Sequence, residues 1–118
     1  MTGKFVAREK SRAFALRVVK LCRFLQERDR EYVLSRQLLR SGTAIGALIR
    51  EAEQAESRAD FVHKLSIALK EASETAYWLD LLTESGYLDS VHGQSMMADT
   101  EELLKILTAI IRTTKRRR

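Results

Sequence analysis

The chain of 118 residues contains no proline, no asparagine and only five glycines. Turns draw heavily on these residue types, and a β-rich protein of this length needs many turns. So few turn-forming residues predict a small number of long elements, and helices are the elements that reach such lengths. We therefore predict an all-α fold. The hydrophobic share of 45% is enough to give its helices a common core.

Apolar spacing divides the chain into four helical segments. We expect helices at about 7–28, 30–56, 58–85 and 90–113, joined by connections of only a few residues. Short connections make successive helices antiparallel neighbours. The predicted architecture is one domain over residues 1–118, an antiparallel up-and-down four-helix bundle that frays into a basic tail at 112–118.

Polar residues and one glycine mark the expected helix ends. Asp29 is expected to break the first helix and to cap the second. Ser57, with Asp60 three residues later, is expected to cap the third. Gly86 fits a helix C-terminal cap, and Asp89 or the serine after it is expected to open the fourth helix.

The second segment holds a run of small residues, SGTAIGA, at 41–47. Each glycine inside a helix costs about 0.8–1 kcal/mol relative to alanine. One interpretation is that the run lets a neighbouring helix approach closely. The other is that the helix breaks or bends there.

Charge is distributed unevenly along the chain, whose net charge is +5. Residues 1–50 carry 12 basic and 4 acidic side chains, residues 51–111 carry 4 basic and 12 acidic, and residues 112–118 add five basic ones. A protein polarised in this way can bind a polyanion with one face. It can also bind copies of itself by pairing opposite faces.

Two basic groups are candidates for contacting nucleic-acid phosphates. The first is an arc on the first helix and the second is the C-terminal cluster: Arg8, Arg12, Lys20 and Arg23, then Arg112, Lys115, Arg116, Arg117 and Arg118. The alternative for the arc is a solvated face, or one that pairs with the acidic surface of another subunit. The alternative for the cluster is a solubilising end.

Several apolar residues do not fit the expected core stripes. They lie on the first and third helices: Leu16, Phe24, Tyr77, Trp78 and Leu81. A second packing surface would explain them, and self-association is the simplest way to provide one. A single broad core is the alternative.

No catalytic site, metal site or cofactor is predicted. Asp60-x-x-His63 and Asp89-x-x-His92 have the acid-x-x-His spacing of di-iron bundles, but both acids lie at helix starts, where Asp acts as a cap. Cys22 borders an apolar stripe and fits a buried structural thiol. We therefore predict that the protein is not an enzyme, with a metal-dependent enzyme as a distant alternative.

No stretch approaches the roughly 18–20 apolar residues that a membrane span requires. The first ten residues carry charges without a following apolar region, so no signal peptide is predicted. A cytoplasmic protein is expected, without a membrane partner or an evident small-molecule substrate.

Two blocks of sequence carry a family resemblance. Residues 37–52, QLLRSGTAIGALIREA, and residues 60–72, DFVHKLSIALKEA, stand at the expected separation. Together they resemble the four helix bundle protein family, also called the 23S rRNA intervening-sequence protein family, over roughly residues 14–90. Members of that family commonly have Ser at the position of Ala44 and Asn at the position of Leu48, so a polar spot of the family is apolar here.

The resemblance implies a left-handed antiparallel four-helix bundle that assembles into a ring, typically a homopentamer, with no defined biochemical role. Its architecture is similar to the accessory protein of diversity-generating retroelements, a basic pentamer that binds a reverse transcriptase and nucleic acid. Our hypothesis is a homo-oligomeric scaffold that contacts RNA or DNA through basic surface. The alternative is a protein-interaction adaptor whose charges serve subunit pairing.

Overall fold

The computed structural model describes residues 3–117. These residues form four α-helices and no strand: α1 Gly3–Asp29, α2 Val33–Ala52, α3 Arg58–Glu84 and α4 Ser90–Arg116. The all-α prediction is confirmed. The bounds differ from those expected, because α1 already includes Gly3, α2 is shorter at both ends, and α4 continues to Arg116 instead of fraying from 112 onward.

The connection between α1 and α2 corrects the role predicted for Asp29. Asp29 is the last residue of α1, and its carboxylate pairs with Arg28 at 2.5 Å instead of capping the next helix. Arg30 then turns the chain with a left-handed backbone φ of 53°.

Glu31 supplies the cap that was expected from Asp29. Its buried carboxylate accepts hydrogen bonds from backbone N–H groups in the first turn of α2, at 2.8–3.1 Å, from Val33, Leu34 and Ser35. These bonds satisfy donors that a helix start leaves without partners.

The caps of α3 and α4 are the expected ones. The Ser57 hydroxyl accepts from the N–H of Asp60 at 3.0 Å, and the Asp89 carboxylate accepts from the N–H of His92 at 2.9 Å. Gly86 has a φ of 89° and ends α3. Leu88 is buried behind it, and its N–H donates to a carbonyl in the last turn of α3.

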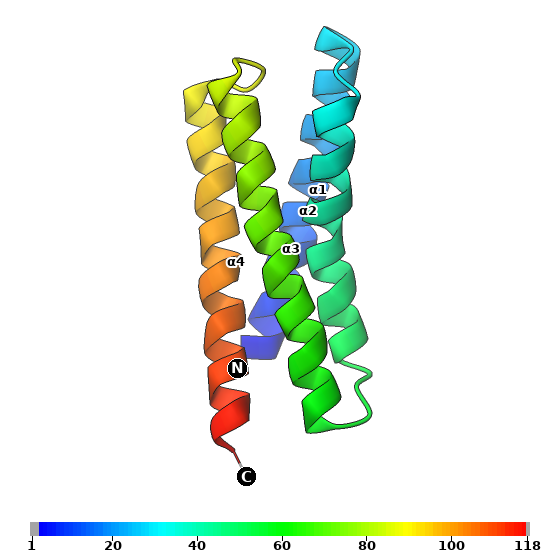
Figure 1. Cartoon of the computed structure of the whole chain (residues 1–118), viewed down its shortest axis with the longest axis vertical. Helices are drawn as coiled ribbons and strands as arrows, with labels where there is room; N and C mark the ends of the chain where they lie inside the picture. Colours follow the sequence, from blue (N-terminus) through cyan, green and yellow to red (C-terminus); the bar gives the residue numbers. More distant parts are fainter. Residues whose placement is uncertain (1–2, 118) are drawn as a thin grey trace.

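The helices run alternately up and down, each beside the next one in sequence (Figure 1). Their apolar stripes meet in one core along the length of the bundle, and its fully buried members include Phe14, Val18, Leu38, Leu79 and Leu107. α1 and α4 close the bundle but contact each other much less than the other neighbouring pairs do. The molecule measures 50 × 22 × 21 Å.

The small-residue run of α2 is continuous helix, so the interpretation as a break is wrong. Gly42 lies against Val18 of α1, and Gly46 lies against the backbone of Ser11. On the other side, the Thr75 hydroxyl of α3 donates to the Ser41 hydroxyl at 2.9 Å. The run therefore serves the close approach of α1.

Two ends of the bundle matter for the site. The basic end holds residues 3–8, 53–58 and 112–117, and the described termini lie there (Figure 1). The far end holds the α1–α2 and α3–α4 connections. None of the helices in the described part of the chain is long and apolar enough to cross a membrane.

Candidate functional site

Cys22 and the acid-x-x-His pairs were the residues considered for chemistry. The Cys22 thiol is buried and donates to the carbonyl of Ser35 at 3.2 Å. Burial, together with the charge of Glu31, raises the pKa of this thiol to about 12. It therefore stays protonated and is a poor nucleophile. Within residues 3–117, no three His, Cys, Asp or Glu side chains group in a way that could hold a metal ion.

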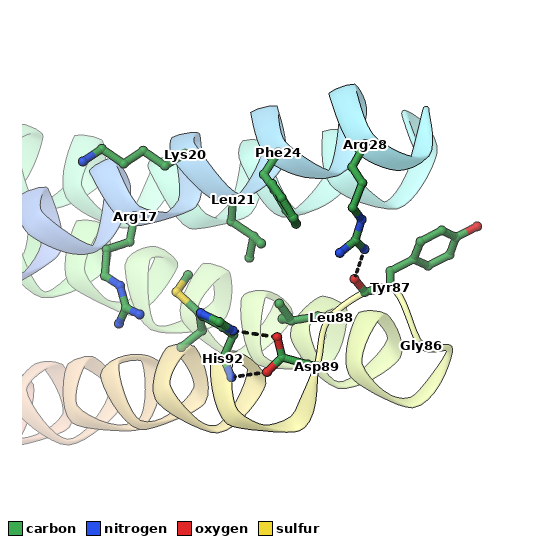
Figure 2. Close-up of a pocket in the computed structure, with 11 residues that line it drawn as sticks. Arg17, Lys20, Leu21, Phe24, Arg28, Gly86, Tyr87, Leu88, Asp89 and His92 are labelled. Atoms are coloured by element: carbon green, nitrogen blue, oxygen red, sulfur yellow. Dashed lines mark hydrogen bonds and ion pairs between the residues drawn. The ribbon is translucent and has the colours of Figure 1, made fainter.

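A groove of about 660 Å³ lies at the far end, between α1 and the start of α4 (Figure 2). It lies where α1 and α4 pack loosely. Its apolar wall combines side chains of both helices and the α3–α4 connection: Leu21, Phe24, Leu88 and Met96. Pockets of this size and character are the usual places for ligands and partner side chains.

Ion pairs within the protein occupy most of the charged groups around this groove. Arg17 pairs with Asp99 of α4 at 2.5 Å. Arg28 donates to the Tyr87 carbonyl at 2.7 Å and lies 4.6 Å from the centre of the Phe24 ring.

His92 and Asp89 form the remaining pair at the groove, at 2.6 Å (Figure 2). The backbone N–H and the ring of His92 both bond the Asp89 carboxylate, and these bonds lower the pKa of that carboxyl. Among the basic residues that line the groove, only Lys20 has no partner within residues 3–117.

The arc predicted on α1 is exposed, but its members differ. Arg8 pairs with Glu53 of the α2–α3 connection at 3.8 Å. Arg12, Lys20 and Arg23 lie on the outer side of α1 and form no ion pair within the described chain.

The predicted basic tail is part of α4. Arg112, Lys115 and Arg116 are exposed on its last two turns, and Arg117 is its C-cap residue. The carbonyl of Arg117 accepts a hydrogen bond from the guanidinium of Arg58 at the start of α3. Arg118 lies outside the described residues.

The apolar residues assigned to a second packing surface divide between exposed and partly buried positions. Leu16, Phe24 and Tyr77 are about half exposed, at 48%, 49% and 55%. Trp78 and Leu81 are partly buried. The Trp78 ring packs edge-on against Tyr77 and donates to the Glu74 carboxylate at 2.8 Å.

A second, shallower hollow lies on α3 and was not predicted from the sequence. Its volume is about 630 Å³, and it lies on the first three turns of α3 beside the last turn of α4. It brings Arg58 and His63 together with Lys115, although only Lys115 was a predicted site residue. These residues lie far apart in the sequence, because Arg58 and His63 are at the start of α3 and Lys115 is at the end of α4. The sequence pattern therefore does not show that they form a cluster.

The two positions of α2 at which this chain differs from the family pattern, Ala44 and Leu48, contribute no polar group to these sites. Leu48 is partly buried and packs against the core, and Ala44, one turn earlier, is also partly buried.

Comparison with known proteins identifies a family and similar solved structures. The family model described as 23S rRNA-intervening sequence protein matches residues 4–109, which confirms the resemblance carried by the small-residue run and the block after it. The chain is 51% identical to a protein of unknown function from the S23 ribosomal protein family of Bacteroides thetaiotaomicron. The match covers 94% of this chain and 99% of that one, with a TM-score of 0.93. No curated protein matches the chain.

Proposed function

Because the chain belongs to the 23S rRNA-intervening sequence protein family, whose role is undefined, we propose a function from its surface: a non-enzymatic homo-oligomeric helical scaffold that contacts RNA or DNA through its basic end. The observation that carries the proposal is a pair of exposed apolar faces, flanked by opposite charges, on two helices that lie diagonally across the bundle. The proposal has two parts, self-association and contact with a polyanion.

Self-association is supported by the exposed apolar side chains. Leu16 and Phe24 belong to the outer face of α1, and Tyr77 belongs to the outer face of α3 with Leu81 one turn later. Within the described chain α1 and α3 lie diagonally across the bundle: the backbone of each packs on α2 and α4, and the two helices meet only through side chains, as where Lys4 lies 4.7 Å from the centre of the Phe61 ring. One molecule therefore offers two different apolar faces on opposite sides of the bundle.

The charges around these two faces are complementary. Lys20 and Arg23 flank the apolar residues of α1, and Asp80 and Glu84 flank those of α3. None of the four forms an ion pair within residues 3–117. The α1 face of one copy therefore fits the α3 face of the next copy. Such a contact between unlike faces is heterologous and builds rings or filaments.

Position along the bundle favours a ring. Both faces extend toward the far end of the molecule, so neighbouring copies can pack side by side with little shift along the long axis (Figure 1). A shift along the axis would produce an open helical filament, so a ring requires its absence together with a rotation between neighbouring copies that closes.

Charge reversal tests this pairing. Lys20→Glu/Arg23→Glu and Asp80→Lys/Glu84→Lys should each reduce the solution mass to that of a monomer in light scattering. An equimolar mixture of the two variants should associate again, because each restores the charge that the other lacks. Glu101→Lys/Lys105→Glu on the outer face of α4 is the matched control and should assemble normally. A monomeric wild-type protein, or assembly that only the α1 variant disrupts, would contradict the pairing.

Contact with nucleic acid is supported by the basic end. If α1 pairs with a neighbouring copy, Lys20 and Arg23 are covered. The cations of the last α4 turns stay free: Arg112, Lys115, Arg116 and Arg117 have no acidic partner in the described chain. Such clusters bind phosphates without reading sequence, and a ring would present one cluster per subunit.

Binding of labelled RNA over a salt series tests this part. Affinity should fall steeply and linearly with log salt, and Arg112→Gln/Lys115→Gln/Arg116→Gln should flatten the slope. Arg36→Gln/Arg50→Gln/Lys105→Gln is the control, because these three exposed cations form no ion pair within residues 3–117 and lie outside both apolar faces. Absence of binding at about 50 mM salt would sink the nucleic-acid contact. An intact oligomer without RNA binding would favour the protein-interaction adaptor.

A further inference from the structure

The shallow hollow on α3 combines two kinds of surface that a nucleotide uses. Six residues line it: Arg58, Ala59, Val62, His63, Ser66 and Lys115. Five of them come from the first three turns of α3, and Lys115 comes from the last turn of α4. The hollow is therefore built by two helices that pack against each other.

One part of the hollow is cationic. Arg58 donates an N–H to the carbonyl of Arg117, which orients its guanidinium and leaves further donors open to solvent. Lys115 has no acidic partner in the described chain. No acidic side chain lines the hollow, and the carboxylate of the nearby Asp60 accepts from the backbone N–H of Glu56 at 3.3 Å. The local charge therefore suits a phosphate group.

The other part of the hollow is apolar and aromatic. Ala59 and Val62 contribute small side chains to its surface. The His63 ring is exposed and makes no hydrogen bond within residues 3–117. An exposed ring beside small apolar side chains is a surface on which an unpaired base can stack.

We propose that this hollow holds one nucleotide of a single-stranded nucleic acid. The phosphate lies at Arg58 and Lys115, and the base lies on Ala59 and Val62 against the His63 ring. The inference rests on the proposed contact of the basic end with nucleic acid, and it specifies the class of that ligand. A duplex keeps its bases inside the helical stack, so it can use the two cations but not the ring.

Anisotropy of a labelled oligouridine of about 12 nucleotides, compared with the same strand annealed to its complement, tests the inference. Single strands should bind more tightly than the duplex. Arg58→Gln/Lys115→Gln should weaken binding of the single strand and flatten its salt slope by about 0.7, since the two cations hold one phosphate and each phosphate contributes about 0.7. Arg36→Gln/Lys105→Gln removes two exposed cations from the outer sides of α2 and α4 and is the matched control, expected to bind like wild type.

Substitution of the ring separates stacking from charge. His63→Ala should weaken single-strand binding about tenfold without changing the salt slope, and His63→Phe should restore it. Wild-type protein that binds no RNA would refute the polyanion contact and this inference together. Wild-type binding that neither hollow variant changes, or a preference for the duplex, would overturn this inference alone.

Discussion

The carboxylate of Glu31 closes the start of α2 because it accepts three of the N–H groups that a helix leaves unpaired in its first turn. Burial alone would raise the pKa of this carboxyl, but the backbone N–H bonds outweigh it and lower the pKa. Sequence reasoning favoured Asp29, since Asp is a usual cap and Glu is not. The left-handed turn at Arg30, which brings Glu31 into place, has no signature in the sequence.

Loss of this cap should make stability less dependent on pH. A carboxyl whose pKa is lowered by folding stabilises the protein above its unfolded pKa of about 4.3, and this stabilisation disappears as pH falls through the folded pKa. Glu31→Gln should lower the free energy of unfolding by about 1 kcal/mol at pH 7 in urea titrations. The difference from wild type should shrink below about pH 4. Exposed Glu101→Gln is the control, and an equal loss at both pH values would contradict the capping role.

Gly42 and Gly46 should respond in opposite directions to alanine. A Cβ on Gly42 would lie 2.9 Å from a methyl group of the fully buried Val18, whereas one on Gly46 would lie 3.4 Å from the nearest atom of Ser11. Overpacking should therefore outweigh the helix propensity gained in Gly42→Ala, with a net loss of about 1 kcal/mol. Gly46→Ala should be neutral or stabilise by up to about 1 kcal/mol. Thermal unfolding of the two variants checks this, and equal shifts would mean that α1 can move aside.

Whole elements were predictable where periodicity and capping agree. Ser57 and Asp89 cap α3 and α4 as expected, because a capping side chain precedes a strong apolar stripe in both places. The predicted end of α4 was wrong, because the run of basic residues from 112 onward was expected to fray. Cations near a helix C-terminus interact favourably with the helix dipole, and the helix continues to Arg116.

Gly86 ends α3 in a conformation that other residues rarely adopt. Its φ of 89° lies in the left-handed region, and a Cβ there would meet no atom of residues 3–117 within 4 Å. Substitution should therefore cost backbone strain alone, about 1–2 kcal/mol for Gly86→Ala. Gly86→Asn should lose less, because asparagine tolerates this region better. Urea titrations of wild type and the two variants measure the order of their stabilities. An alanine variant as stable as wild type would show that the connection can adopt another conformation.

At the scale of the whole molecule, the candidate sites depend on the distances between neighbouring helices. The periodicity of apolar residues does not predict these distances. The stripe of α1 predicts which side faces the core, but not that α1 and α4 separate enough to leave a groove beside Phe24. The hollow on α3 likewise requires Arg58 and Lys115 to meet across two helices. Charge polarity was readable because it is a property of composition. The partner of each charge was not, as the Arg8–Glu53 pair illustrates.

The shape of the assembly tests how the molecule uses its two faces. Each bundle is 50 Å long and about 22 Å wide. Copies that pair α1 with α3 lie side by side, so small-angle X-ray scattering should give a particle that grows in width while its height stays near 50 Å. Association through the basic end, which gathers like charges, would instead give a particle about twice as long, and it should be favoured only by added polyanion. A protein-only assembly elongated along the bundle axis would therefore contradict the side-by-side arrangement.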